Sequence, residues 1–116
     1  MSTQAPDVAA SVKAFKQAVN MPAHVLTAWL ATDDSKKVGF KASENGESVG
    51  HQSGKKIVAL LGKNQADYTP GDAAHARKVV GYIHRHLAQR PDGDVSDTPW
   101  RYSLMNWGHD PQRDKP

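Results

Sequence analysis

The chain has 116 residues, of which 38% are hydrophobic and 23% charged, so it can form one modest core and is too apolar to be disordered throughout. It contains no cysteine, which excludes disulfide bonds, thiolate metal sites and cysteine nucleophiles. No apolar run approaches the ~18 residues that cross a bilayer, and the first residues lack the layout of a secretory signal. We expect a cytoplasmic protein with no membrane partner, one domain over residues 1–111 and a flexible tail at 112–116.

The first third of the chain predicts two helices. Four apolar residues follow the N-cap candidate Asp7 at helical spacing; they are Val8, Val12, Phe15 and Val19. Asn20 is expected to break this helix and cap a second one, with Pro22 in its first turn. The second helix should end near Ala31, before a polar run at 32–35.

Residues 38–50 leave two alternatives open. The turn signal Asn45–Gly46 favours a short hairpin, whereas the glycines are equally typical of a loop. The helical pattern that returns at Ile57 begins either near Glu47 or at Ser53. The longer version places two glycines inside the helix, at ~1 kcal/mol each relative to alanine, and needs close helix packing as a reason.

The strongest helix signal lies at residues 69–72. Thr69, Pro70 and Asp72 form an N-cap, a first-turn proline and an acid that reaches back to the cap. The helix should run to about Gln89, with an apolar arc that includes Ile83 facing the core. Two cations project opposite this arc and three rings line one of its borders. The cations are Lys78 and Arg85, and the rings are His75, Tyr82 and His86.

A last short helix is predicted after Asp97 or Thr98, with Pro99 at its start and Gly108 at its end. The whole pattern indicates an all-α, small single domain of about five helices. Trp29, Trp100 and Trp107 are expected to meet in its core, each with the indole N–H near the surface or a carbonyl group.

Catalytic and metal signatures are weak. The glycines before Lys55 do not match the spacing of a phosphate loop, because Val49 stands where a glycine is needed and Lys56 where a hydroxyl is needed. His84 and His86 point apart on a helix, so they cannot share a metal ion. His109 and Asp110 are expected to lie in a solvated turn. We therefore expect no enzyme activity, no metal and no cofactor.

The charge distribution favours a polyanion as partner. Residues 36–90 contain ten Lys and Arg against four Asp and Glu, a net charge of +6, while the rest of the chain carries −3. An ordinary solvated surface would show the same excess, so both interpretations stay open. Nucleic acid is the partner that we favour, DNA over RNA. The candidate contacts are Lys36, Lys37, Lys55, Lys56, Arg77, Lys78 and Arg85.

The expected contacts are mostly to phosphates, with low sequence specificity. The helices at about 47–62 and 70–89 are joined by roughly seven residues, longer than the ~3–4 residues of a helix-turn-helix motif. Histidine protonation below about pH 6.5 would add positive charge near the same surface.

Three segments resemble an uncharacterised family. They are Glu47–His51, Val79–Pro91 and, most specifically, Trp100–Pro111. The sequence is similar to the family catalogued as domain of unknown function 3140 over roughly residues 11–111. The resemblance implies a small single-domain protein; some members are labelled DNA-binding, and the family has no established catalytic residues.

The final block also supports an alternative function. Arg101, Tyr102, Asn106 and His109 are expected to face outward mostly, either as a polar rim for a partner or as a network that holds the last helix. The network is favoured. The alternative function is a protein-interaction or stress-associated structural module that uses the Trp100–Trp107 helix. The oligomeric state stays open.

Overall fold

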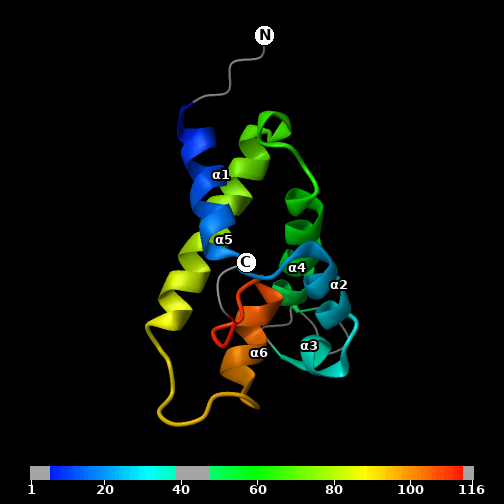
Figure 1. Cartoon of the computed structure of the whole chain (residues 1–116), viewed down its shortest axis with the longest axis vertical. Coiled ribbons are helices and arrows are strands. Elements are labelled where there is room, and N and C mark those ends of the chain that lie inside the picture. The colour runs from blue at the N-terminus through cyan, green and yellow to red at the C-terminus, as the bar shows by residue number, and fades with distance from the viewer. Residues whose placement is uncertain (1–5, 39–47, 114–116) are drawn as a thin grey trace.

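The computed structural model describes residues 6–38 and 48–113, and all regular elements within these ranges are helical (Figure 1). The all-α prediction is therefore confirmed. The helices are α1 (Pro6–Ala18), α2 (Ala23–Leu30), α3 (Asp33–Lys37), α4 (Val49–Leu61), the 3-10 turn η1 (Gln65–Asp67), α5 (Pro70–Leu87) and α6 (Pro99–Asn106). The region of the expected hairpin or loop lies mostly outside the described residues.

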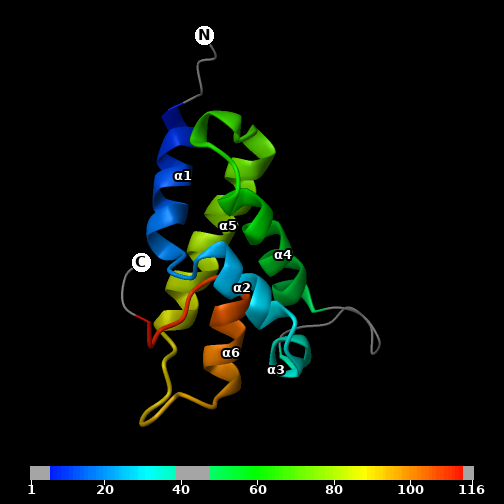
Figure 2. The ribbon, with the colours of Figure 1, turned by 45° about the vertical axis from the view of Figure 1, so that its right-hand side comes forward.

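The helices form two groups joined by α6. Helix α1 packs along α5, and α2 packs on α4 (Figures 1 and 2). Helix α6 contacts α2, α3, α4 and α5, so it joins the two groups. The apolar side chains of both groups form one core cluster, in which Phe15, Leu26, Ile57 and Ile83 are almost completely buried. Within the described residues, no helix is both long and apolar enough to span a membrane.

Helix α5 follows its sequence signal closely. The Thr69 hydroxyl accepts a hydrogen bond from the Asp72 N–H, and the Asp72 carboxylate accepts one from the Thr69 N–H, both at 3.0 Å. This confirms the predicted capping box. Val79 and Ile83 of the apolar arc are buried, and the helix ends at Leu87, slightly before the predicted Gln89. Thr98 is the N-cap of α6.

Three details of the first half differ from the prediction. Helix α1 begins at Pro6, so the N-cap candidate Asp7 lies inside the helix. The polar run after α2 forms a short helix, because the Thr32 hydroxyl accepts a hydrogen bond from the Ser35 N–H and caps α3. Asn20 does not cap α2, whose N-cap is Pro22. The Asn20 side chain instead bonds to the backbone of Asp110, far away in the sequence.

Helix α4 takes the longer of its two predicted forms. Ser48 is the N-cap, and its hydroxyl accepts a hydrogen bond from the His51 N–H. A Cβ atom on Gly54 would lie 2.7 Å from the carbonyl oxygen of Asn106, and one on Gly50 would lie 3.0 Å from Nε1 of Trp107. The two glycines therefore permit the close approach of α4 to the C-terminal end of α6. This close packing is the reason that the sequence required for two glycines inside a helix.

Candidate nucleic-acid interface

The structure places two of the seven predicted contact residues at one cavity and a third, Lys56, at a second cavity between α4 and α5. Lys78 and Arg85, seven residues apart on α5, lie on nearly the same line of the helix and line the same cavity. Lys56 of α4 lines the second cavity together with His75 and Asp72. The positive charges of Lys56 and Lys78 lower the pKa of His75, whereas the negative charge of Asp72 raises it. We call the three cations, Lys56, Lys78 and Arg85, the cationic groove.

Lys55 and Arg77 do not join this groove. Lys55 lies on the side of α4 that faces α2, beside Thr27 and His51. Arg77 lies on the side of α5 that faces α1, where its guanidinium donates a 3.0 Å hydrogen bond to the Ser11 hydroxyl. Both differ from their basic neighbours by one position, which turns a helical side chain by about 100°.

Lys36 and Lys37 are exposed at the end of α3. Asp33 and Asp34 occupy the first turn of the same helix, so its charged side chains sum to zero. The sequence interval that begins at Lys36 leaves out these two acids and overstates the positive charge available there.

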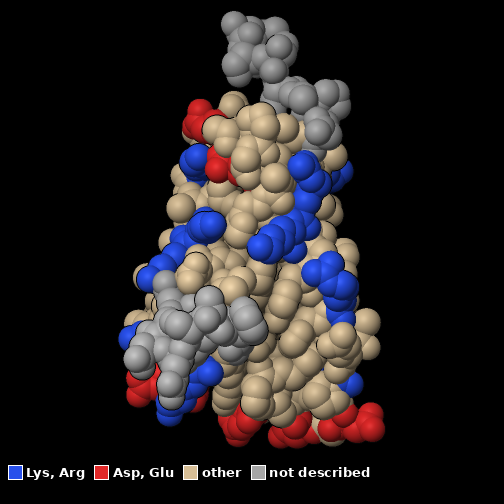
Figure 3. All heavy atoms as spheres, turned by 180° about the vertical axis from the view of Figure 1, so that it is seen from behind, with Lys and Arg blue, Asp and Glu red and all other residues tan. Residues whose placement is uncertain are grey.

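Figure 3 shows one face of the molecule, on which Lys and Arg are spread over the middle part while Asp and Glu gather near the two ends. In the described part of the chain, the ion pairs are Lys63–Asp72, at 2.7 Å, and Arg101–Asp110, at 3.0 Å. Among the described residues the groove cations therefore form no ion pair, although Lys56 shares its cavity with Asp72, the ion-pair partner of Lys63.

A continuous stack of five rings lies beside the cationic groove, in the order His75, Trp107, Tyr82, His86 and Trp100. Successive ring centroids are 6.5, 4.3, 5.2 and 5.7 Å apart, with interplanar angles between 11° and 19°. The three members on α5 are the rings that the sequence placed at the border of the apolar arc. The structure adds two tryptophans from the C-terminal block to this border.

Hydrogen bonds fix the stack at both ends. His86 Nε2–H donates to the Trp100 carbonyl at 2.9 Å, and Trp100 Nε1–H donates to the His86 carbonyl at 2.8 Å. At the other end, the Ser53 hydroxyl lies 3.1 Å from Nε2 of His75. The rings are therefore held rigidly against the helices.

Burial and charge shift the pKa values of the ionisable rings. Burial lowers the pKa of His75, and the charges of Lys56 and Lys78 lower it further. Burial also lowers the pKa of His86, against the opposing effect of its hydrogen bond to the Trp100 carbonyl. Burial raises the pKa of Tyr82, although the Ser103 hydrogen bond and the positive charge of Arg85 oppose the rise. Near neutral pH these groups are neutral.

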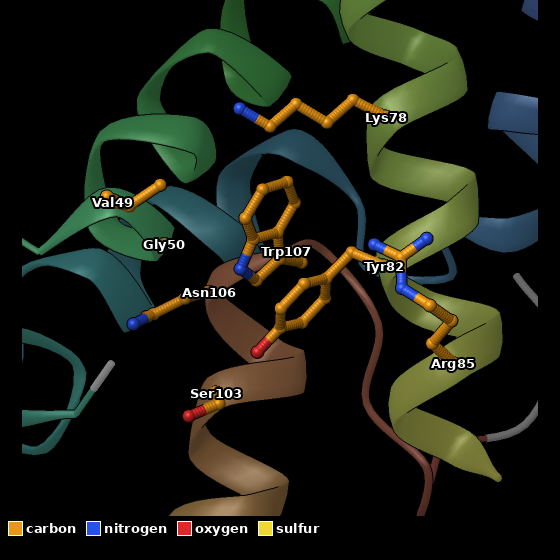
Figure 4. A pocket seen from close by; sticks show the side chains of 8 residues that line it. All are labelled: Val49, Gly50, Lys78, Tyr82, Arg85, Ser103, Asn106 and Trp107. Carbon is orange, nitrogen blue, oxygen red and sulfur yellow. The ribbon is translucent and has the colours of Figure 1, made fainter. Parts of the chain in front are cut away.

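A cavity of about 310 Å³ opens between α4, α5 and α6 next to the stack (Figure 4). We call it the α5–α6 cavity. Its lining residues are Val49, Gly50, Lys78, Tyr82, Arg85, Ser103, Asn106 and Trp107. Lys78 extends from α5 toward α4, and Tyr82 extends toward α6, where its hydroxyl is hydrogen-bonded to Ser103 (Figure 4). Apolar ring edges, two cations and a hydroxyl thus meet at one opening.

His109 and Asp110 do not form the expected solvated turn. Asp110 accepts two hydrogen bonds of 3.0 Å from the Arg101 guanidinium, and its N–H donates to the Asn20 side-chain oxygen at 2.8 Å. His109 Nδ1–H donates to the Ala18 carbonyl at 2.7 Å. Burial alone would raise the pKa of Asp110, but the hydrogen bonds from Arg101 and from a backbone N–H hold it below its ordinary value. We call Asn20, Arg101, His109 and Asp110 the Asp110 network.

Asn106 is buried, contrary to the expectation that it faces outward. Its side-chain oxygen accepts from Trp29 Nε1–H, at 2.7 Å, and from the Ser35 hydroxyl, and its amide donates to the Ser35 carbonyl at 2.9 Å. Trp100 and Trp107 are buried too. The C-terminal block is therefore the structural network that the sequence analysis favoured over a polar rim.

The sequence pattern does not predict the cavity walls formed by Val49, Ser103 and Trp107. Two signals pointed there. Gly50 and Gly54 required a close neighbour without naming it, and the border position of Tyr82 required a partner on another helix. The partner is Trp107, which appeared in the sequence only as a core residue.

Comparison with known proteins identifies a family for this chain but indicates no function. No curated protein and no solved structure matches the chain. A family model described as a protein of unknown function, DUF3140, matches residues 14–105, which include most of the helical core and the cationic groove. The chain belongs to the DUF3140 family.

Proposed function

We propose that this protein is a non-enzymatic nucleic-acid-binding module that contacts mainly the phosphate backbone, with low sequence specificity. The observation that carries the proposal is that Lys78 and Arg85 line one cavity between α4, α5 and α6, and Lys56 lines a second cavity between α4 and α5. Among the described residues, none of the three cations forms an ion pair. Phosphate recognition requires several cations on one face, and charged side chains of this kind supply affinity without reading base edges.

The groove residues replace the broader set of seven as the primary contacts. Lys36, Lys37, Lys55 and Arg77 lie on other sides of the helices, where they would contribute to long-range attraction more than to direct contact. Few base-edge readers accompany the groove, which supports low sequence preference. We favour DNA over RNA as the partner and the cytoplasm as the location.

The non-enzymatic part of the proposal is supported by the roles of the best catalytic candidates. His109 Nδ1–H is bound to the Ala18 carbonyl, and Asp110 holds Arg101. A general base must reach the proton that it removes, and these groups are committed to holding the C-terminal segment.

The alternative function is a protein-interaction or stress-associated structural module built on the α6 aromatic residues. It has less support, because Trp100 and Trp107 are buried. Within the described residues, Val49 is the exposed large hydrophobic side chain, at 37% exposure. Hot spots at protein interfaces are enriched in Trp, Tyr and Arg side chains that a partner can cover.

The test is a salt titration of binding to a labelled 20-base-pair duplex, followed by fluorescence anisotropy. We expect affinity to fall steeply with salt, because each phosphate contact contributes a slope of about −0.9 in the log–log plot. The double variant Lys56→Ala with Lys78→Ala should flatten the slope by roughly two and weaken all duplex sequences about equally, by roughly tenfold or more.

The matched control is Lys36→Ala with Lys37→Ala, which removes the same charge from α3. It should weaken binding less and leave the slope nearly unchanged. Equal effects of the two double variants would show that total charge, and not the groove, determines binding. Absence of binding to duplex DNA, single-stranded DNA and RNA at low salt would overturn the proposal and favour the protein partner.

A further inference from the structure

The α5–α6 cavity is built to hold more than a phosphate. Its volume of about 310 Å³ lies at the lower end of the range of small-ligand pockets. Most of its wall is apolar, formed by the exposed side chain of Val49 and the edges of Tyr82 and Trp107. A phosphate group alone would gain nothing from such a wall, so a ligand that fills the cavity must carry an apolar part.

The wall presents ring edges and not ring faces. Tyr82 and Trp107 stack on each other at 4.3 Å, and their other faces are covered by His86 and His75. The indole Nε1 of Trp107 lies beside Gly50, at 3.0 Å from the position that a Cβ atom there would take. A planar ring entering between Val49 and Trp107 would meet positive ring edges, which prefer the face of another aromatic ring.

The cations stand at the opening of the same cavity. Arg85 folds back along α5, with Nη1 3.0 Å from the position that a Cβ atom on Gly81 would take. Gly81 therefore gives the guanidinium room to lie beside Tyr82, whose hydroxyl is already bound to Ser103. Lys78 approaches from the other side of the opening (Figure 4). An aromatic ring in the cavity with an anionic group at its edge would satisfy the apolar wall and both charges.

We infer that the α5–α6 cavity binds one unpaired nucleotide, with the base between Val49 and Trp107 and the phosphate at Lys78 and Arg85. This inference rests on the proposed function, which it deepens, because it names single-stranded nucleic acid as the preferred form. A base in a duplex is stacked and paired, so it cannot enter without the cost of being flipped out. A free nucleotide has the same chemistry, and the experiment distinguishes the two sources.

The experiment compares a labelled 12-nucleotide single strand, the corresponding duplex and the same strand with all bases removed, at one salt concentration. We expect the single strand to bind about tenfold more tightly than the duplex or the abasic strand. AMP is titrated separately, with tryptophan fluorescence as the signal. Equal affinity for the three strands, without an AMP response, would overturn the inference while leaving backbone binding intact.

The variant Val49→Trp fills the mouth of the cavity and keeps all three groove cations. It should remove the preference for the single strand and leave duplex binding unchanged. The matched control is Ala28→Trp, which places the same side chain at an exposed position on α2 and should change neither affinity. Loss of duplex binding in Val49→Trp would contradict the assignment of the cavity to the base.

Failure of the proposed function would look different. If no strand binds at low salt but AMP does, and Val49→Trp abolishes the AMP response, the cavity takes a free nucleotide and the backbone proposal is wrong. If neither AMP nor any strand binds, both the inference and the proposed function are wrong.

Discussion

The Asp110 network and the cationic groove use similar residue types in opposite ways. In the network, Arg101 meets Asp110 in a bidentate pair, and Asn20 and His109 bind backbone groups of the opposite segment. In the groove, Lys78 and Arg85 stand at a cavity without an acidic partner in the described residues. Polar groups that satisfy one another stabilise the fold, whereas charges aimed at a cavity remain available to a ligand.

The substitution Ile83→Ala should have the largest effect on the unfolding free energy, and it serves as the reference for substitutions in both regions. Ile83 is almost completely buried on the core side of α5, away from the groove. Removing its side chain should cost about 2–5 kcal/mol of unfolding free energy. Denaturant unfolding measures the loss, and a value under about 1 kcal/mol would show that the core face of α5 is assigned wrongly.

The substitution Asp110→Asn tests the structural role of the network. The amide removes the negative charge and can accept only one of the two Arg101 hydrogen bonds, in a site where the Asp110 side chain is 14% exposed. We expect a loss of about 1–3 kcal/mol of unfolding free energy, with nucleic-acid affinity unchanged at a temperature where the variant is folded. A selective loss of affinity would mean that the two regions are not separate in function.

The same comparison explains how much the sequence could predict. The capping box at Thr69 and the apolar arc around Ile83 depend on residues a few positions apart, so the local sequence predicts both the start of α5 and its buried face. The Asn20–Asp110 and Trp29–Asn106 bonds join residues 90 and 77 positions apart. Each of these side chains has a plausible local role, such as a cap or an exposed polar group, and only the fold decides between the local and the distant partner.

The candidate site follows the same rule. The charge excess of residues 36–90 indicated a polyanion, and the border position of Tyr82 on α5 was correct. The separation of Lys55 from Lys56, and of Arg77 from Lys78, follows from the turn of about 100° between neighbouring helical residues. Which member of each pair lies away from the groove depends on where α1 and α2 pack. The cavity itself depends on Trp107, which stacks on Tyr82 of α5 from the C-terminal end of α6. Its lining residues come from distant segments of the chain, so no local sequence pattern predicts it.

The substitution Gly81→Ala should separate stability from binding in the groove. Alanine in a helix interior is favoured over glycine by about 0.5–1 kcal/mol, and the nearest atom to the new Cβ is the flexible end of Arg85. We expect the unfolding free energy to rise by up to this amount, while single-strand affinity falls because the guanidinium moves from the cavity opening. The control Ala74→Gly, at an exposed position of the same helix, should lower stability by a similar amount. A loss of stability in Gly81→Ala would indicate that the Arg85 side chain cannot move away from the new Cβ atom.

The smallest expected effect distinguishes the two regions by pH. The pKa values of His75 and His86 in the ring stack are lowered from 6.5, mainly by burial. As the pH falls, these two histidines are therefore protonated in the unfolded chain before they are protonated in the folded one. The free energy of unfolding should then decrease as the pH drops below about 6.5 toward the folded pKa values. The pKa of Asp110 is lowered from 3.8, so its contribution is complete above that pH and is lost only as the pH falls further.

Urea unfolding at pH 7.5, 6.0 and 5.0 measures the first decline, and the same series below pH 4 measures the second. The variant His86→Gln should flatten the decline between pH 6.5 and 5, whereas Asp110→Asn should leave it in place and flatten the acidic one. Protonated His75 lies beside Lys56 and Lys78, so single-strand binding should strengthen over the range in which stability falls. Protonation of His75 would then strengthen ligand binding and lower stability. Burial in the ring stack disfavours the charged imidazole, whereas a phosphate in the groove attracts it.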